Sequence, residues 1–215
     1  MQTDIERGPP DGMLFLRKES FREYVRRYPV TTLLLAIQIA LYIATEVYGS
    51  SKDELTLEHF GALFRDGGSA PEWWRYIAPI FLHSGIEHLL FNSFALLVFA
   101  PPLERLFGPL RYAAFYLLTG IIGNIATDLF HSEPYMAIGA SGAIFGVYGA
   151  YIYIGLFKPE VLDIQSRKTM YTIVIIGIVF TFISRQVNVS AHLGGFVAGV
   201  ALAAVMSLLP LRRFD

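Results

Sequence analysis

Long runs of apolar residues, broken by Pro, Gly and charged residues, dominate the chain. They fall at about 30–48, 86–100, 110–130, 138–157, 169–184 and 189–209. Because a helix needs roughly 20 apolar residues to cross a bilayer, the pattern predicts an all-α polytopic membrane protein with six transmembrane helices. The second, fourth and fifth runs are short for a full crossing, and we expect their ends to lie below the membrane surface or against neighbouring helices.

The segment between the first two runs, residues 49–85, is too interrupted by polar residues to span a membrane. It is rich in aromatic residues: Phe60, Phe64, Trp73, Trp74, Tyr76 and Phe81. A structureless loop of this length is unusual in a compact domain. The segment is therefore predicted to be a folded interfacial element, with Trp and Tyr at the level of the lipid headgroups.

The pattern divides the chain into an N-terminal tail (1–28), a membrane domain (29–209) and a short C-terminal tail (210–215). No small-residue cleavage site follows the first run, so we expect that run to be retained. Within the basic tail, 14–28 fits either an amphipathic helix on an anionic leaflet or a solvated tail that serves only topology. Most of the 17 Lys and Arg lie in the two tails and in the 101–111 and 158–168 loops. Both termini are therefore predicted to be cytoplasmic.

The composition of the chain argues against several classes of protein. The chain is 54% hydrophobic and 16% charged, more apolar than a soluble domain of 215 residues. A net charge of −1 without a basic cluster gives no reason to expect nucleic acid as a partner. The sequence contains no Cys, which excludes disulfides, thiolate catalysis and Cys-ligated metals.

Polar residues inside a membrane are costly, so they are candidates for function. His88 and Asn92 are four residues apart and therefore share one face of the second run. From the spacing alone, the pair either donates hydrogen bonds to a ligand or joins neighbouring helices.

A second polar position lies before the fourth run, in the sequence Gly139-Ala140-Ser141-Gly142. Ser141 stands where a helix should begin, so capping the helix is its simplest role. The free N–H groups at a helix start also favour an oxyanion beside the serine.

A third polar position is His192 in the sixth run, which on its own is as easily a packing residue. Gly195 and Gly199 form a small-residue stripe beside it, and Gly142, Gly146 and Gly149 line the fourth run. The two helices are therefore expected to approach backbone to backbone. Such an approach would bring Ser141 within hydrogen-bonding reach of His192.

Taken together, these motifs resemble the rhomboid family of intramembrane serine proteases. The matching stretches, in order, are His59-Phe60-Gly61-Ala62, Trp74-Arg75, residues 83–92 (HSGIEHLLFN), Glu104-Arg105 with Gly108, residues 139–142 (GASG) and residues 191–196 (AHLGGF). The resemblance implies a six-helix rhomboid-like bundle with an interfacial loop between helices 1 and 2, in a bacterial plasma membrane. It also implies that the serine lies at the foot of a cavity that is open to water on the outer side.

The resemblance also assigns roles to residues. It implies that Ser141 is the nucleophile and His192 the general base, with His88, Asn92 and the amides at Ser141 and Gly142 stabilising the oxyanion. It implies structural roles near the site for Gly139, Phe145, Gly195 and Gly199, for Trp74 and Arg75 in the interfacial loop, and for Glu104 and Arg105 at the inner end of helix 2. Phe145 departs from members that carry Tyr at this position.

No carboxylate is spaced to orient His192, because Asp128, the one acid within an apolar run, has no spacing that commits it there. A Ser–His dyad is therefore predicted, with the imidazole held by packing alone. No cofactor is expected, and no metal, since the histidines lack further ligands at set spacing.

The expected partners are the lipid bilayer and membrane-protein substrates. Their scissile region should contain helix-destabilising residues, because a helix hides its carbonyls in its own hydrogen bonds. One alternative is a non-catalytic relative that binds membrane proteins or acts in their quality control. The other is a small transporter or channel, although the chain shows no inverted repeat.

Overall fold

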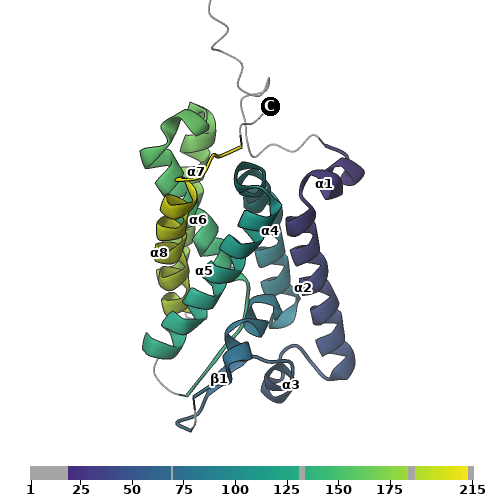
Figure 1. The fold of residues 1–215 in the computed structure, drawn as a ribbon. Helices are drawn as coiled ribbons and strands as arrows, with labels where there is room; N and C mark the ends of the chain where they lie inside the picture. The colour runs from purple at the N-terminus through teal and green to yellow at the C-terminus, as the bar shows by residue number, and fades with distance from the viewer. Residues whose placement is uncertain (1–18, 69, 131–133, 184–186, 213–215) are drawn as a thin grey trace, which may run out of the picture.

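The computed structural model describes residues 19–212 except 69, 131–133 and 184–186. The described chain is a bundle of long helices with a small two-stranded sheet at one end (Figure 1). The helices are α1 (Phe21–Arg27), α2 (Pro29–Tyr48), α3 (Glu54–His59), α4 (Gly85–Phe107), α5 (Pro109–Phe130), α6 (Ser141–Phe157), α7 (Ile164–Ile183) and α8 (Val189–Met206). The strands are β1 (Leu63–Arg65) and β2 (Tyr135–Ala137), and the 3₁₀ turns are η1 (Trp73–Tyr76), η2 (Ala78–Phe81) and η3 (Pro159–Val161).

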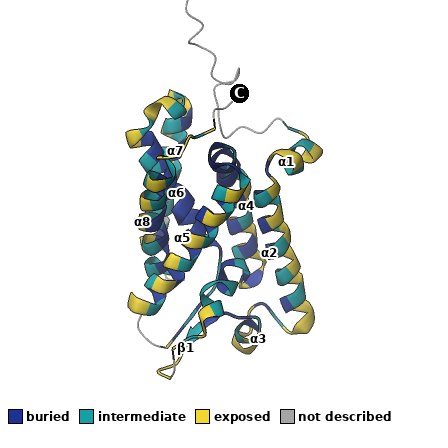
Figure 2. Ribbon diagram, in the orientation of Figure 1, coloured by how far each residue is buried: buried dark blue, intermediate teal, exposed yellow. Residues whose placement is uncertain are grey.

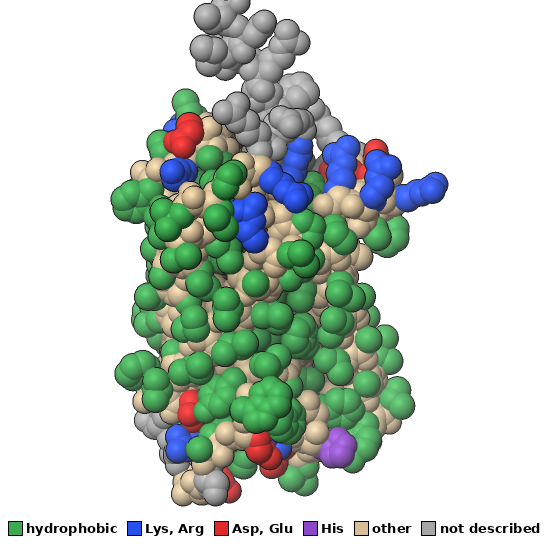
Figure 3. Space-filling view, in the orientation of Figure 1, with side chains coloured by type: hydrophobic (Ala, Val, Ile, Leu, Met, Phe, Trp, Pro, Cys, Tyr) green, Lys and Arg blue, Asp and Glu red, His purple; other side chains and the backbone are tan. Residues whose placement is uncertain are grey.

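Five of these helices are long and apolar enough to cross a membrane, namely α2, α4, α5, α7 and α8, and α6 is a shorter apolar helix. Many large apolar side chains on their outer faces are exposed, whereas the residues between helices are buried (Figure 2). Charged side chains gather at the two ends of the bundle and leave an apolar band between them (Figure 3). The predicted all-α membrane bundle is confirmed.

The lengths predicted for the second and fifth runs are wrong. α4 has 23 residues and continues through Pro101 and Pro102, although the sequence suggested an end at 100. Pro101 has no N–H to donate to the carbonyl of Leu97, four residues earlier. The Tyr24 hydroxyl donates to that carbonyl at 3.3 Å, so a residue of α1 replaces the missing partner.

The fifth run also begins earlier than its apolar residues suggest. α7 begins at Ile164 rather than near 169, and it has 20 residues. The side chain of Asp163 accepts a hydrogen bond from the Ser166 amide at 2.8 Å, which satisfies one free N–H of the first turn. The largely polar residues 164–168 therefore form the first turn of α7.

Glu104 joins the C-terminal end of α4 to the start of α2. Its buried carboxylate accepts the backbone N–H groups of Val30 and Thr31, both at 2.9 Å, and the Thr31 hydroxyl at 2.6 Å. The first amides of a helix have no partner within it, so a carboxylate from another helix serves here as the cap. This contact fixes α2 against α4.

The N-terminal tail is described only from residue 19. Its helix, α1, has seven residues and a capping box formed by Ser20 and Glu23. Tyr24 and Tyr28 are buried, while Phe21 is 83% exposed. The amphipathic interfacial helix considered for 14–28 stays a prediction, and residues 14–18 lie outside the described residues.

The segment 49–85 is folded, as predicted. It contains α3, β1, η1 and η2 and lies at the end of the bundle opposite α1 (Figure 1). β1 pairs antiparallel with β2, with Leu63 opposite Ala137 and Arg65 opposite Tyr135. This pairing ties the segment to the residues that lead into α6.

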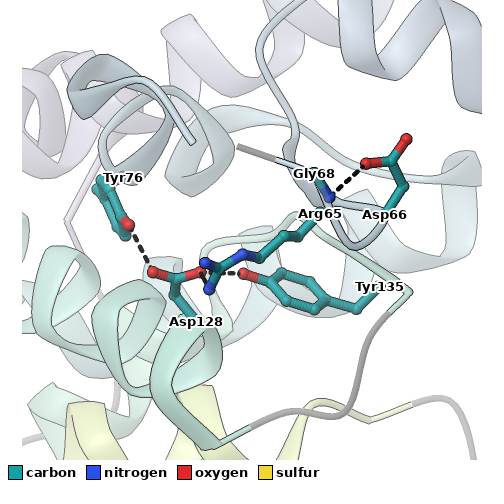
Figure 4. Close-up of polar contacts among 6 residues, drawn as sticks. All are labelled: Arg65, Asp66, Gly68, Tyr76, Asp128 and Tyr135. Atoms are coloured by element: carbon teal, nitrogen blue, oxygen red, sulfur yellow. Dashed lines mark hydrogen bonds and ion pairs between the residues drawn. The ribbon is translucent and has the colours of Figure 1, made fainter. Parts of the chain in front are cut away.

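Asp128 near the end of α5 anchors the same segment. Its carboxylate accepts hydrogen bonds from Arg65 at 3.0 Å, Tyr76 at 2.7 Å and Tyr135 at 2.6 Å (Figure 4). Burial and the hydrogen bond to this carboxylate raise the pKa of Tyr76 to about 12. Because β1, η1 and β2 converge on one carboxylate, Asp128 holds both the segment 49–85 and β2 on α5.

Candidate active site

Ser141 is the first residue of α6, and it does not cap that helix. Ala140 occupies the N-cap position, and no side chain caps the helix start. The simplest interpretation of Ser141, a capping role, is therefore wrong. The first amides of α6 have no acceptor four residues earlier in the helix, so they remain available beside the serine.

Gly139 brings the His88 region to the start of α6. Its amide donates to the carbonyl of Pro79 at 2.8 Å, and its φ of +117° is one that L side chains rarely adopt. A Cβ at Gly139 would lie 2.7 Å from His88 Nε2 and 3.9 Å from the Ser141 amide nitrogen. Only glycine therefore allows this imidazole to lie against the backbone beside Ser141.

The contact between α6 and α8 sets the register between Ser141 and His192. A Cβ at Gly195 would lie 2.0 Å from the carbonyl oxygen of Gly142, and one at Gly199 would lie 2.0 Å from that of Gly146. The predicted backbone-to-backbone approach is present. Since Gly142 also lies against the carbonyl of Ala191, Ser141 and His192 stand at the same level of the two helices.

Phe145 adds a direct contact between the two helices. Its ring stacks on the His192 imidazole, with centroids 3.9 Å apart and an interplanar angle of 17°. Residues four apart share one face of a helix, so Ser141 lies one turn from Phe145 on the face that meets His192. The Tyr hydroxyl that Phe145 lacks is not needed for this stack.

The start of α8 is fixed by Asn188. Its side chain accepts from the Ala191 amide at 2.9 Å and donates to the Thr127 hydroxyl at 2.9 Å. The amide of His192 donates to the carbonyl of Asn188 at 3.1 Å. His192, which is 6% exposed, is thereby held in the first turn of α8 and against α5.

The structure reveals one contact of His192 that the sequence analysis missed. The hydroxyl of Thr181 in α7 lies 2.8 Å from His192 Nδ1. The expectation that packing alone holds the imidazole is therefore wrong. The available signal was a polar residue close to the end of an apolar run, but its spacing gave no link to His192.

Asn92 and His88 lie together on α4, as their spacing predicts. The Asn92 amide nitrogen donates to the carbonyl of His88 at 2.9 Å, and Asn92 is 6% exposed. His88 Nδ1 accepts the Ser84 amide at 3.4 Å, and the His83 ring lies 5.0 Å away, centroid to centroid. In a neutral imidazole whose Nδ1 accepts, Nε2 carries the proton. His88 therefore presents an N–H donor toward Gly139.

Four other residues to which the resemblance assigns structural roles make contacts with parts of the chain other than His192. They are Trp74, Arg75, Glu104 and Arg105. The Trp74 ring lies against Gly61, and the Arg75 guanidinium donates to the carbonyls of Glu58 and Ala62. Glu104 caps α2, and Arg105 is half-buried in the last turn of α4. Asp128 in α5 is bonded to Arg65, Tyr76 and Tyr135 (Figure 4). Within the described residues, no group of three or more His, Cys, Asp or Glu could hold a metal ion.

Comparison with known proteins decides the family. The family model described as "Rhomboid domain" matches residues 70–209, which include every helix from α4 to α8. The chain belongs to the rhomboid family. It is thus a multi-pass membrane protein and a serine-type endopeptidase that acts as an intramembrane protease.

Relatives of this rhomboid protease include two proteins of a bacterium and one of a plant. The putative rhomboid protease YdcA of Bacillus subtilis is 37% identical over 205 residues, covering 94% of this chain and 100% of that protein. The rhomboid protease GluP of the same organism is 38% identical over 178 residues, 83% of this chain and 35% of GluP. RHOMBOID-like protein 5 of Arabidopsis thaliana is 35% identical over 158 residues, 72% of this chain and 51% of that protein. This rhomboid protease therefore matches YdcA throughout and only a part of the other two.

Proposed function

We propose that this rhomboid protease cleaves transmembrane segments of other membrane proteins through a dyad of Ser141 and His192. The observation that carries the proposal is the contact of Gly195 with the carbonyl of Gly142, together with the stack of Phe145 on His192. Nucleophile and base must lie within hydrogen-bonding reach, and these contacts support the dyad because they bring the first turns of α6 and α8 together. Among the described residues, the partner of His192 Nδ1 is the Thr181 hydroxyl and not a carboxylate, and Asp128 is bonded instead to Arg65, Tyr76 and Tyr135.

The reaction is acyl transfer in two steps. Ser141 Oγ attacks the scissile carbonyl while His192 takes its proton, and His192 then gives that proton to the leaving amine. Water attacks the acyl-enzyme in the same way, His192 takes the proton of the water, and Ser141 Oγ regains a proton as the acid leaves. Every proton in the cycle passes through one imidazole.

The negative charge that develops on the scissile carbonyl oxygen needs donors at the start of α6. The free amides of Ser141 and Gly142 are two candidates, and His88 Nε2–H, held against Gly139, is a third. Asn92 supports His88 through the carbonyl of that residue, and its second amide hydrogen is a further donor.

The proposed orientation places both termini in the cytoplasm of a bacterial cell and the dyad near the outer face. Exposed Arg22, Arg26 and Arg27 lie on α1, and Lys and Arg side chains cluster around that end of the molecule (Figure 3). Cytoplasmic ends of membrane proteins carry an excess of such residues. Ser141 and His192 lie in the first turns of α6 and α8, toward the opposite end, where β2 joins the interfacial segment (Figure 1).

The substrate proposed is a transmembrane helix with Gly, Ser or Pro near its outer end. The test uses purified protein in liposomes and a reporter with one transmembrane segment, whose cleavage site is mapped by mass spectrometry. We expect a cut near the extracytoplasmic end of the segment. Replacing two or three of these Gly, Ser or Pro residues by Leu should slow it about tenfold, because the helix then unwinds less easily. A cut at the cytoplasmic end, or equal rates for both reporters, would contradict the proposal.

A further inference from the structure

The hydroxyl of Thr181 makes two hydrogen bonds at once. It lies 2.9 Å from the carbonyl oxygen of Gly177, four residues earlier in α7, and 2.8 Å from His192 Nδ1. Thr181 is 2% exposed and His192 is 6% exposed, so protein surrounds both groups. The hydroxyl has a single proton, so it can be the donor in only one of the two bonds.

Counting protons assigns the direction of each bond. A carbonyl oxygen only accepts, so the hydroxyl proton goes to Gly177. The Thr181 oxygen then has only lone pairs to offer, and His192 Nδ1 must be the donor. A neutral imidazole carries one N–H, which leaves the lone pair on Nε2.

We propose that Thr181 is a positioning residue that holds His192 in the tautomer with its proton on Nδ1. This inference rests on the proposed dyad, because it concerns the nitrogen that would take the proton of Ser141 Oγ. A base must present a lone pair to the nucleophile, and in serine proteases with three residues a carboxylate fixes that tautomer. Here a neutral hydroxyl, whose own proton is fixed by the backbone, does the same.

The neighbouring residues explain why both the stack and the hydrogen bond are needed. The stack of Phe145 fixes the plane of the imidazole, but a half-turn about the Cβ–Cγ bond would keep the ring in that plane and exchange the positions of Nδ1 and Cδ2. The bond from Nδ1 to Thr181 stops this rotation. At Gly177, α7 packs against the Phe145 ring that stacks on His192. A Cβ at Gly177 would be 3.2 Å from Tyr148 Cε2 and 3.7 Å from Phe145 Cζ. One turn of α7 thus supports both restraints on His192.

The same bond persists through the reaction. When Ser141 Oγ bonds to the scissile carbon, its proton moves to His192 Nε2, and Nδ1–H still donates to Thr181. The C–N bond then breaks, and the Nε2 proton goes to the leaving amine. The Thr181 hydroxyl neither gains nor loses a proton at any step, so its effect is on geometry and tautomer.

The test compares Thr181→Val, which keeps the shape and removes the hydroxyl, with Thr181→Ser, which keeps the hydroxyl. We expect Thr181→Val to lower kcat about tenfold with little change in KM, and Thr181→Ser to remain close to wild type. The matched control is Thr45→Val in α2. Thr45 is 1% exposed and its hydroxyl also bonds to a carbonyl of its own helix, that of Tyr42. This control should keep wild-type kcat.

A second readout reports the tautomer directly. In lipid-embedded protein with ¹⁵N-labelled histidine, with His192 assigned by its loss in His192→Gln, we expect Nδ1 protonated in wild type and in Thr181→Ser. Thr181→Val should give a mixture of both tautomers. An Nε2–H tautomer in wild type, or Thr181→Ser as slow as Thr181→Val, would overturn the inference. If wild-type protein cleaves no substrate, the proposed dyad fails, while the spectrum still decides the tautomer.

Discussion

Ser141→Ala is expected to reduce cleavage of a transmembrane reporter to the uncatalysed background. The variant keeps the helix start, because Ala140 and not Ser141 is the N-cap of α6. Loss of the nucleophile in a serine protease lowers kcat on the order of 10⁶-fold, which lies below detection in a proteoliposome assay. Expression and the melting temperature should stay close to wild type. The measurement is cleavage of the reporter by purified protein in liposomes.

Two further variants are needed to interpret this result: one that removes the base and one that serves as a control. His192→Ala should lose activity to the same extent, because nucleophile and base act as a unit. Ser207→Ala, which changes a serine in the turn after α8, should retain activity. Cleavage by Ser141→Ala at a measurable fraction of the wild-type rate would assign the nucleophile to another residue.

Gly195→Ala is expected to cause a large loss of stability. The added Cβ would lie 2.0 Å from the carbonyl oxygen of Gly142 and 2.8 Å from its carbonyl carbon, both backbone atoms that no rotamer change can move. The two helices would have to separate. Overpacking of this kind costs on the order of 3 kcal/mol, equivalent to a fall of about 10 °C in the melting temperature.

The control for this prediction is the glycine on the other side of the same contact. A Cβ at Gly142 would lie 3.4 Å from the carbonyl oxygen of Ala191, an ordinary van der Waals distance. Gly142→Ala should therefore melt close to wild type. Equal melting temperatures for Gly195→Ala and wild type in a thermal scan in detergent would show that α6 and α8 are not in backbone contact.

Much of this arrangement was predictable because its signals are local. Small residues four apart predicted the α6–α8 contact, and the separation of His88 from Asn92 placed both on one face of α4. The resemblance to rhomboid proteases then assigned these residues to one site. Their catalytic roles stay predictions until the variants are measured.

What the sequence did not reveal depends on contacts between distant segments. α4 continues through Pro101 because Tyr24, 73 residues before Leu97, donates to the carbonyl that the proline leaves without a partner. Thr181 reaches His192 only because α7 packs on α6 at Gly177. Neither partner follows from periodicity or spacing, since both are set by how helices pack.

The most direct test of the central claim is to label the wild-type protein in lipid with a fluorophosphonate, which reacts with serines activated by a base. Peptide mapping should find the phosphonyl group on Ser141, and His192→Ala should remove the label. Absence of label from active wild-type protein, or label on a different serine, would contradict the assignment of Ser141 as the nucleophile.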